Sequence, residues 1–411
     1  TKTGTNAAGN VRGRAPKIHS CAPLGCFCIS PVSHLSTPTL MIVNRLIALD
    51  MPAGLAFVER VRTAWENGDA VFPIDQRLPQ PAKQHLVNQF MPTEIIDRDG
   101  EQHHFPDSLP INSGDALVIA TSGSTGTPKG VVHTHSTIDA YLAMTSQRLA
   151  IDSSAHWLLC LPVSHVAGFS IVARSIKIGN PITIQSKFET ALVEQAAKNG
   201  ATHASLVPTA FKRINPSLFS CILLGGSAAP PDLPENVIAT YGMTETLGGI
   251  AYNGIPLDLV EIQVDAQQIM VRSPSLCRRY IDSPITVDSQ GWYHTGDSGS
   301  YENGMISVFG RTDDMIITGG ENVWPKVVED VISQMQSITQ VVVRGLPDDE
   351  WGQRVVAWVV SDSHELTLDK VRNFVKEQLP SYCAPTELHR LQDLPLTSLG
   401  KVDVQALKDL R

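Results

Sequence analysis

The stretch ALVIATSGSTGTPKGVVHTHS, residues 116–136, is the part of the sequence that decides the fold. The apolar run at 116–122 is typical of a buried strand, and a second strand-like run, VVHTHS, follows at 131–136. Between them, residues 121–130 contain three glycines, five hydroxyl side chains and Lys129. Glycines permit positive φ and a close approach to a ligand, and successive backbone N–H groups in such a turn form an anion-binding concavity. The stretch therefore predicts a phosphate-binding loop between two strands.

This loop differs from the P-loop of nucleoside triphosphatases, which needs Gly-Lys-Ser/Thr directly at the start of a helix. Here the order is Pro-Lys-Gly at 128–130, and a strand-like run follows. A flexible serine and glycine linker is the alternative interpretation. We favour a binding role, because turn residues this dense directly after a buried strand are typical of functional loops.

Strand-like and helix-like runs alternate on the C-terminal side of this loop. Strands are expected at 157–163, 181–186, 201–209 and 221–226, and a helix at 188–200. Such alternation predicts an α/β fold with mostly parallel layers. Between about 255 and 310, short alternating strands separated by Gly, Asp and Ser predict a small barrel-like β subdomain.

A boundary is expected near GRTDDMI, residues 310–316. Beyond it we expect a helix at 325–334, strands at 338–345 and 354–361, and a helix at 368–378. About 100 residues are enough for a small α+β domain. The predicted division is therefore a poorly ordered extension at 1–38, a large domain at 39–310 and a small, mobile α+β C-terminal domain at 311–411.

The composition excludes some classes of protein. The chain has 411 residues, 42% of them apolar, and a formal net charge of −9. A protein of this sign has no general affinity for nucleic acid, so any anion must be held by a local group of donors. Seven cysteines in an uneven arrangement indicate reduced thiols and a cytoplasmic location. No apolar run reaches the roughly 18–20 residues that span a bilayer, so no membrane span is expected.

Five stretches in order resemble the motifs of the adenylate-forming superfamily, which includes acyl-CoA synthetases, peptide-synthetase adenylation domains and luciferases. They are TSGSTGTPKGVVHTH (121–135), YGMTET (241–246), YHTGD (293–297), GRTDDMIITGGENVWP (310–325) and LPLTSLGK (394–401). The resemblance covers about residues 115–405. It implies that a carboxylate attacks the α-phosphate of ATP, giving an acyl-adenylate and pyrophosphate, and that a thiol then displaces AMP. ATP, Mg²⁺ and coenzyme A are the cofactors and co-substrates that it implies.

The resemblance also implies a nucleotide site. The loop would hold the β- and γ-phosphates, Tyr241 would stack near the adenine, and Asp297 would accept hydrogen bonds from both ribose hydroxyls with Arg311 as its partner. Thr244 would contact the α-phosphate, and Glu245 would coordinate Mg²⁺, which prefers carboxylate and phosphate oxygens. The implied nucleotide-binding residues are Thr121, Ser122, Gly123, Ser124, Thr125, Gly126, Thr127, Lys129, Gly225, Gly226, Ser227, Tyr241, Gly242, Met243, Asp297 and Arg311.

Two further elements are implied for the C-terminal domain. Lys401 would reach the α-phosphate and the attacking carboxylate during adenylation. Asp313 falls where the family has its hinge, and rotation there would replace Lys401 by the segment that contains Gly319, Gly320 and Glu321. Those glycines would line the channel for the pantetheine arm of coenzyme A. Such a rotation is a gating step of a kind that enzymes commonly use.

The stretches LPVSHVAGFSIVARS (161–175) and THASLVPTAFKRI (202–214) resemble the 2-succinylbenzoate–CoA ligases of menaquinone synthesis. This resemblance places Ser164, His165 and Gly168 near the acyl pocket, with His165 among the catalytic residues; without it, a satisfied core histidine would be the preferred interpretation. 2-Succinylbenzoate keeps one charged carboxylate in the pocket, and a buried charge needs a partner. Arg213 is our candidate, since a guanidinium binds a carboxylate through two hydrogen bonds. A basic pair with Lys212 on a helix surface is an equal alternative.

The sequence therefore predicts an ATP-dependent ligase that converts 2-succinylbenzoate and coenzyme A to 2-succinylbenzoyl-CoA, AMP and pyrophosphate. A general aryl- or acyl-CoA synthetase is the alternative within the superfamily, and a non-catalytic nucleotide-binding protein is the alternative from another class. The expected partners are a small-molecule acid, ATP and coenzyme A. The oligomeric state stays open, with a homodimer as one option.

Overall fold

The computed structural model describes residues 44–109, 111–121, 128–227, 229–230, 232–363, 365–395 and 402–410. The predicted extension at 1–38, the predicted phosphate-loop residues 122–127 and Lys401 lie outside these residues. Among the described residues, no helix is both long and apolar enough to cross a bilayer.

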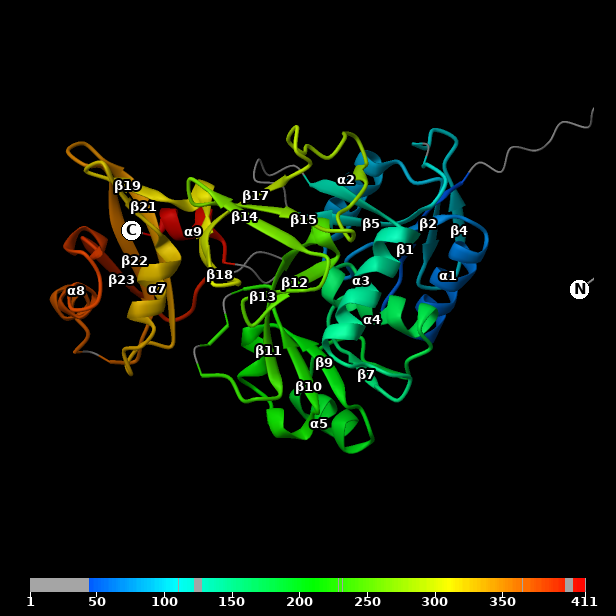
Figure 1. Ribbon diagram of the computed structural model, residues 1–411, viewed down its shortest axis with the longest axis horizontal. Coiled ribbons are helices and arrows are strands. Elements are labelled where there is room, and N and C mark those ends of the chain that lie inside the picture. The colour runs from blue at the N-terminus through cyan, green and yellow to red at the C-terminus, as the bar shows by residue number, and fades with distance from the viewer. Residues whose placement is uncertain are drawn as a thin grey trace, which may run out of the picture. The chain divides into compact units, whose positions relative to one another are not determined.

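The first sheet has seven strands in the order β16-β6-β5-β2-β1-β3-β4 (Figure 1). Its central strands pair in parallel, whereas β4, β6 and β16 pair antiparallel with their neighbours. Its elements are β1 (Leu46–Asp50), α1 (Leu55–Glu66), β2 (Ala70–Pro73), α2 (Gln80–Phe90), β3 (Glu94–Asp97), β4 (Gln102–His104), β5 (Asp115–Thr121), β6 (Lys129–Thr134) and β16 (Arg279–Tyr280).

The second sheet also has seven strands, in the order β13-β12-β11-β10-β9-β7-β8. The strands from β8 to β11 are parallel, and β12 and β13 extend the sheet antiparallel. Its elements are α3 (His135–Arg148), β7 (Trp157–Leu159), α4 (Val166–Lys177), β8 (Ile182–Ile184), α5 (Thr190–Lys198), β9 (His203–Leu206), α6 (Pro208–Phe211), η1 (Pro216–Leu218), β10 (Cys221–Leu224), β11 (Val237–Met243), η2 (Thr244–Thr246), β12 (Gly248–Tyr252) and β13 (Ile255–Pro256).

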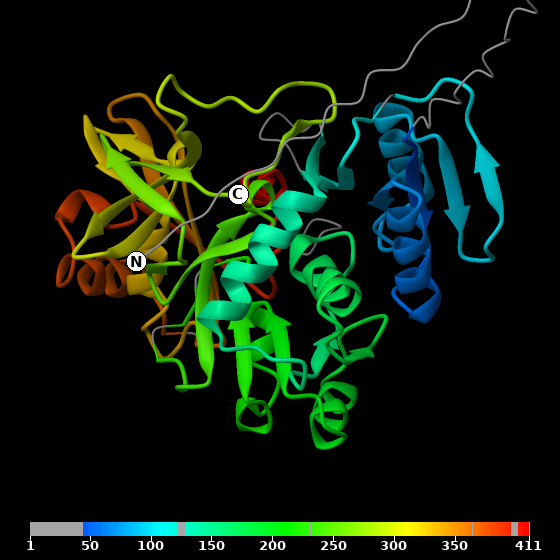
Figure 2. The same cartoon turned by 45° about the vertical axis from the view of Figure 1, so that its right-hand side comes forward.

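Helices α1, α3 and α4 fill the space between these two sheets. Alternate residues of β1 show why: Ile47 and Leu49 pack with α1, whereas Leu46 and Ala48 pack with α2 on the other face. This is the period of two that a strand buried on both faces must have. Helix α5 covers the outer face of the second sheet. The result is a layered α/β arrangement in which α3 and α4 run close together (Figures 1 and 2).

The predicted β subdomain is a four-stranded antiparallel sheet in the order β14-β15-β17-β18. Its strands are β14 (Glu261–Asp265), β15 (Gln268–Arg272), β17 (Tyr293–Glu302) and β18 (Met305–Arg311). Asp297 of β17 lies directly opposite Arg311 of β18 in the register. The sheet therefore places two predicted nucleotide-site residues side by side.

A five-stranded sheet follows, with the order β20-β19-β22-β21 and β23 paired in parallel to β22. Val328 of α7 and Val371 of α8 pack on one face, and Leu407 of α9 packs on the other. The elements are η3 (Thr312–Asp314), β19 (Ile316–Thr318), β20 (Glu321–Val323), α7 (Pro325–Ile332), β21 (Gln340–Asp348), β22 (Gly352–Val360), α8 (Leu368–Lys376), η4 (Ser381–Cys383), β23 (Glu387–Leu391) and α9 (Val404–Asp409).

The predicted α/β fold class is confirmed. Some predicted elements end early for reasons of backbone chemistry. The strand expected at 157–163 stops at Leu159, before Pro162, which has no N–H to donate to a neighbouring strand. The strand expected at 221–226 stops at Leu224, because Gly226 takes a φ of +84°. The domain limits at 38/39 and 310/311 stay a prediction.

Candidate active site

The predicted phosphate loop connects β5 and β6, which pair antiparallel with Thr121 opposite Lys129. Residues 122–127 lie outside the described part of the chain. Lys129 is exposed at the start of β6, and its Nζ lies 5.2 Å from the ring centre of Tyr280 on β16. Since β16 pairs with β6, Tyr280 comes to the base of this loop from a segment far along the chain.

The turn that carries Thr244 and Glu245 is held by a buried threonine. The Thr246 hydroxyl bonds to the carbonyls of Met243 and Gly248 at 3.1 and 2.8 Å. Gly242 is required next to this turn, because a Cβ at that position would lie 1.9 Å from the Gly248 oxygen. Tight pairing of β11 with β12 therefore fixes the backbone from which Glu245 projects.

Glu245 accepts a hydrogen bond at Oε1 from the Tyr280 hydroxyl at 2.9 Å, and the hydroxyls of Tyr280 and Tyr293 are 3.3 Å apart. Burial, followed by the negative charge of Glu245, raises the pKa of both tyrosines well above 10.0. Both phenols therefore stay protonated at neutral pH, and Tyr280 donates to the carboxylate. An oriented carboxylate beside Thr244 is a donor set of the kind that Mg²⁺ prefers.

The pairing expected between Asp297 and Arg311 is present, with Arg311 Nη1 3.2 Å from Asp297 Oδ1. The Tyr241 hydroxyl donates to Asp297 Oδ2 at 2.9 Å. Burial, and then the charge of Asp297, raises the pKa of Tyr241 far above 10.0, so that its hydroxyl keeps its proton. Each carboxylate oxygen has two lone pairs, so Asp297 keeps acceptor capacity for further hydroxyls.

The Arg311 guanidinium contacts Asp297, and the charge of Glu245 has a weaker effect on it. Partial burial lowers the pKa of Arg311, but the charge and hydrogen bond of Asp297, with smaller effects of Asp313 and Glu245, outweigh burial and raise the pKa above its ordinary value. Lys129 lies over the ring of Tyr280, and the hydroxyl of Tyr280 donates to Glu245. The structure therefore brings three predicted site residues, Lys129, Glu245 and Asp297, into one neighbourhood.

The loop predicted to lie along the adenine begins where β10 ends. Gly225 is required there, since a Cβ would lie 2.4 Å from Thr240 Oγ1 on the neighbouring strand. Gly226 and Ser227 are exposed. This loop follows β10, and Tyr241 lies in the C-terminal part of the adjacent parallel strand β11. In open α/β sheets, ligands bind beyond the carboxyl ends of the strands.

The predicted acyl-pocket residues surround the start of α4. His165 is the residue immediately before the helix, and its Nε2 lies 2.7 Å from Arg77 Nη2. Ser164 is buried, and its hydroxyl has no hydrogen-bond partner among the described residues. Gly168 is required, because a Cβ would lie 2.3 Å from the Pro162 oxygen. Arg213 is exposed with its guanidinium 5.1 Å from the Phe188 ring, and its role toward a substrate stays a prediction.

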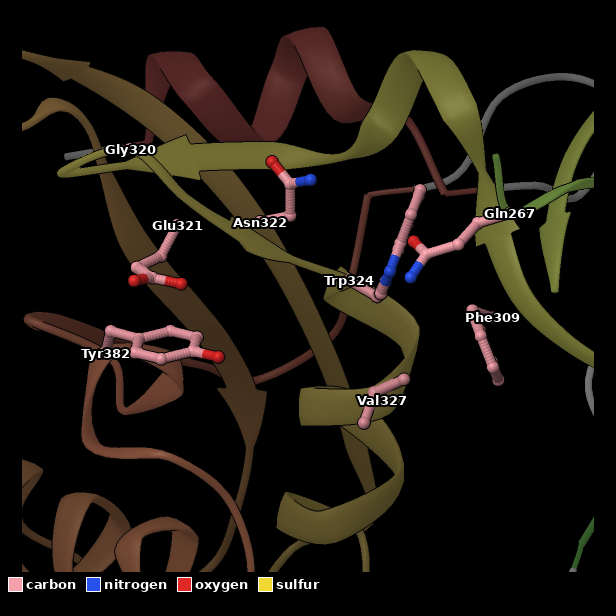
Figure 3. A pocket seen from close by; sticks show the side chains of 8 residues that line it. All are labelled: Gln267, Phe309, Gly320, Glu321, Asn322, Trp324, Val327 and Tyr382. Atoms are coloured by element: carbon pink, nitrogen blue, oxygen red, sulfur yellow. The ribbon is translucent and has the colours of Figure 1, made fainter. Parts of the chain in front are cut away.

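The predicted hinge and channel residues are all exposed. Asp313 belongs to η3, and Gly319 and Gly320 form the β19–β20 turn with φ values of +59° and +84°. A cavity of about 500 Å³ is lined by Gly320, Glu321 and six further side chains (Figure 3). The six are Gln267, Phe309, Asn322, Trp324, Val327 and Tyr382. The turn thus opens on a space large enough for part of a ligand.

Sequence reasoning missed four side chains at these sites: Asp75, Arg77, Tyr280 and Tyr293. None of them stands in a stretch used for the resemblance except Tyr293, the first residue of YHTGD. Asp75 and Arg77 are two positions apart, but Arg77 meets His165 at a separation of 88 positions. Tyr280 meets Glu245 at a separation of 35 positions and Tyr293 at 13. Of these four residues, only Tyr293 could have been found from the sequence, because it belongs to the YHTGD motif.

His133 on β6 is a further buried partner of the Glu245 turn. Its Nε2 lies 2.7 Å from the Thr244 carbonyl, and burial lowers its pKa to about 4 from 6.5. Between these values His133 is therefore neutral in the native state but takes up a second proton in the unfolded state, so stability falls as the pH drops from 6.5 toward 4. At pH 4.5 we expect this residue to cost roughly 2–3 kcal/mol relative to pH 7.

The measurement compares urea unfolding of the wild type and of His133→Gln at pH 7 and pH 4.5. The glutamine amide can still donate to the Thr244 carbonyl but does not titrate, so the variant should lose less stability on acidification. Parallel pH dependence in the two proteins would show that His133 is not the group responsible.

Comparisons with known proteins show the family to which the chain is similar. Residues 53–275 match the family described as AMP-binding enzyme, and residues 327–401 match the AMP-binding enzyme C-terminal domain. The chain is 34% identical over 326 residues to a Mycobacterium tuberculosis protein named "Probable 2-succinylbenzoate–CoA ligase", covering 72% of this chain and 85% of that protein. It is 32% identical over 335 residues to the 2-succinylbenzoate–CoA ligase of Bacillus anthracis, covering 71% and 69%.

Solved structures give the same result. The o-succinylbenzoate CoA synthetase of Bacillus subtilis in complex with the acyl-adenylate intermediate OSB-AMP matches with a TM-score of 0.79 and 25% identity, covering 89% of this chain and 88% of that chain. The wild-type Escherichia coli MenE bound to an analogue of OSB-AMS matches with a TM-score of 0.72 and 26% identity, covering 89% and 88%. On its sequence matches and its fold, the chain belongs to the AMP-binding enzyme family.

Proposed function

We propose that this protein is an AMP-forming acid–CoA ligase that activates 2-succinylbenzoate as an acyl-adenylate and transfers it to coenzyme A, in menaquinone biosynthesis. The observation that carries the proposal is a pair of oriented carboxylates in a chain more than 30% identical to ligases of that name. Asp297 is held by Tyr241 and Arg311, and Glu245 accepts a hydrogen bond from Tyr280. ATP, Mg²⁺ and coenzyme A are its cofactors and co-substrates.

In the first half of the reaction, the acid carboxylate attacks the α-phosphorus of ATP, and the bond to the β-phosphate oxygen breaks to release pyrophosphate. Asp297 binds the ribose hydroxyls as an acceptor, and its own position is fixed by Tyr241 and Arg311. Glu245, oriented by Tyr280, would hold Mg²⁺, which when bound offsets the negative charge of the phosphates. Thr244 lies one residue away and is proposed to contact the α-phosphate.

Positioning and charge neutralisation explain the acceleration, because two anions must meet at phosphorus. The phosphate loop at 121–130 and Lys401 are proposed to supply the remaining donors; residues 122–127 and Lys401 lie outside the described part of the chain. In the second half, the coenzyme A thiolate attacks the acyl carbonyl carbon, and AMP leaves with its phosphate oxygen. Gly319, Gly320 and Glu321 are proposed to line the approach of the thiol after rotation at Asp313.

The decisive experiment measures pyrophosphate release and coenzyme A-dependent AMP formation by the full chain with 2-succinylbenzoate, benzoate and octanoate. We expect kcat/KM for 2-succinylbenzoate to exceed the other two by at least about 100-fold, the range that one charge-assisted contact provides. Comparable turnover of benzoate or octanoate would favour the general acyl-CoA synthetase. ATP binding without pyrophosphate release for any acid would favour the non-catalytic nucleotide-binding protein.

The same assay with two variants tests which cation binds the second carboxylate of 2-succinylbenzoate. Arg213→Ala should raise KM for 2-succinylbenzoate by roughly 10- to 100-fold and leave KM for benzoate within about twofold, since only the diacid has the second charge. Lys212→Ala is the matched control, because Lys212 is the adjacent exposed cation. An equal rise in KM for both acids would show that Arg213 does not bind the second carboxylate.

We also propose that the protein is located in the cytoplasm. The four cysteines in the described part of the chain, Cys160, Cys221, Cys277 and Cys383, are free thiols. Reduced thiols are typical of compartments that hold ATP and coenzyme A. The partners that the chemistry requires are small molecules.

A further inference from the structure

One aromatic ring stands between two opposite charges at the base of the predicted phosphate loop. Lys129 Nζ lies over the face of the Tyr280 ring, 5.2 Å from its centre. The hydroxyl at the edge of the same ring donates to Glu245 Oε1 at 2.9 Å. Among the residues that the structure describes, no ion pair joins Lys129 to Glu245. Tyr280 therefore contacts both charges, one on its face and one at its hydroxyl.

An ion pair between Lys129 and Glu245 would work against the proposed reaction. Lys129 is exposed, and the side chain of lysine is a flexible stem that carries a compact charge, so its ammonium can move toward a nearby carboxylate. Such a pair would draw the ammonium away from the phosphates of ATP. It would also offset the negative charge with which Glu245 is proposed to hold Mg²⁺. Both groups would then be lost to adenylation.

Tyr280 gives each charge a partner that leaves the charge intact. The face of an aromatic ring attracts a cation without neutralising it. A phenol donates one hydrogen bond to a carboxylate, which keeps its negative charge and its other lone pairs. Burial, and then the charge of Glu245, raises the pKa of Tyr280, so the phenol keeps the proton that it donates. Because this proton points to Glu245, the Tyr293 hydroxyl is the donor in its 3.3 Å contact with Tyr280.

Backbone hydrogen bonds hold the ring in this place from both sides. Strand β16, which contains Tyr280, pairs with β6, and the Ile281 N–H donates to the Gly130 carbonyl at 2.7 Å. On the other side, the Cys277 N–H donates to the Glu245 carbonyl at 2.7 Å. None of these bonds uses the Tyr280 side chain. Variants of that side chain should therefore keep the segment in position.

We infer that Tyr280 is a positioning residue that keeps Lys129 and Glu245 from forming an ion pair, and so keeps the lysine available to phosphate and the carboxylate available to Mg²⁺. This inference rests on the proposed function, which assigns those two roles. Two changes of the same side chain should differ in their effect. Tyr280→Phe keeps a ring between the charges, whereas Tyr280→Ala opens the space in which they meet.

The first test measures the ion pair itself, without nucleotide, metal or acid. Full-length protein is treated with a limiting amount of acetic anhydride, and acetylation of Lys129 is followed by peptide mass spectrometry, with the exposed Lys212 as internal reference. A nearby carboxylate raises the pKa of an amine and so lowers its reactive neutral fraction. Tyr280→Ala should therefore slow acetylation of Lys129 about threefold to fivefold, the range of one partly exposed ion pair.

Loss of the ring alone would act in the opposite direction, because it uncovers the amine. Tyr280→Phe should react at close to the wild-type rate, and Tyr280→Ala combined with Glu245→Gln should recover that rate or exceed it. Tyr301→Ala, which removes an exposed tyrosine of β17, is the matched control and should change nothing. Unchanged or faster acetylation in Tyr280→Ala would overturn the inference. Slow acetylation that persists in the double variant would also contradict it, since burial of Lys129 would then be the cause.

The second test measures Mn²⁺ binding in the presence of ATP by electron paramagnetic resonance, since Mn²⁺ accepts the same oxygen ligands as Mg²⁺. Tyr280→Ala should weaken Mn²⁺ binding by about tenfold, the lower end of the loss when an outer partner of a metal ligand is removed. Adding Lys129→Gln should recover most of this loss, because the competing cation is gone; no recovery would contradict the ion pair. If acetylation behaves as expected but Glu245→Gln leaves Mn²⁺ affinity unchanged, the proposed metal role of Glu245 fails while the separation of charges by Tyr280 stands.

Discussion

Replacement of Glu245 by glutamine is expected to slow pyrophosphate release by roughly 100- to 1,000-fold, the range typical for removal of one preorganised charge-stabilising group. The amide has the same shape and still accepts the hydrogen bond that Tyr280 donates to Oε1. It lacks the negative charge that an Mg²⁺ ligand needs in competition with water. The loss should therefore appear in the chemical step and in the Mg²⁺ concentration needed for half-maximal rate, with the fold unchanged.

Single-turnover release of pyrophosphate at varied Mg²⁺ is the measurement. Glu261→Gln is the matched control, because Glu261 is an exposed carboxylate on β14 that pairs with Arg272. The control should keep the wild-type rate and Mg²⁺ dependence. If Glu245→Gln shows the wild-type Mg²⁺ dependence, the carboxylate is not a metal ligand, whatever its effect on the rate.

Asp115→Ala is expected to lower the free energy of unfolding by roughly 3–5 kcal/mol, the cost of removing one partner from a buried ion pair. Asp115 is 0% exposed and binds two cations, with Oδ1 2.8 Å from Arg278 Nη1 and Oδ2 3.0 Å from Arg279 Nη2. Its Oδ2 also accepts the Asn112 backbone N–H at 2.9 Å. Alanine would leave these three donors without their acceptor.

Urea unfolding at pH 7 measures this loss. Asp258→Ala is the control, since Asp258 forms a comparable contact with Arg148 but its side chain is 51% exposed, where ion pairs contribute at most about 1 kcal/mol. Because Arg279 directly precedes Tyr280 on β16, the Asp115 variant should also weaken the orientation of Glu245. A destabilisation no larger than that of Asp258→Ala would show that the arginine pair is not held by Asp115.

Contiguous motifs account for what was predicted well. The glycine-rich stretch was expected between two strands, and β5 and β6 flank it. The pairing of Asp297 with Arg311 was expected and is present, because β17 and β18 form a simple hairpin that places them opposite each other. The α/β class followed from alternating runs of residues whose periods are set by local backbone geometry.

Contacts between distant segments account for what was missed. Nothing in the turn after β2 marks Arg77 as a partner of a histidine 88 positions away. Nothing near Tyr280 marks it as the donor to Glu245, 35 positions earlier, because its place depends on β16 joining β6 at the edge of the first sheet. Asp115 and Arg279 are separated by 164 positions and meet for the same reason.

The sequence by itself determined the class of fold and the kind of chemistry, because hydrophobic periods, glycine-rich turns and the order of motifs are properties of neighbouring residues. Only the tertiary structure decided how the reactive groups are oriented: which tyrosine holds Glu245, which arginine faces His165, and which carboxylate anchors β16. The physical reason is that hydrogen bonds and ion pairs depend on distances of about 3 Å. Such distances between remote residues arise only when sheets and helices pack.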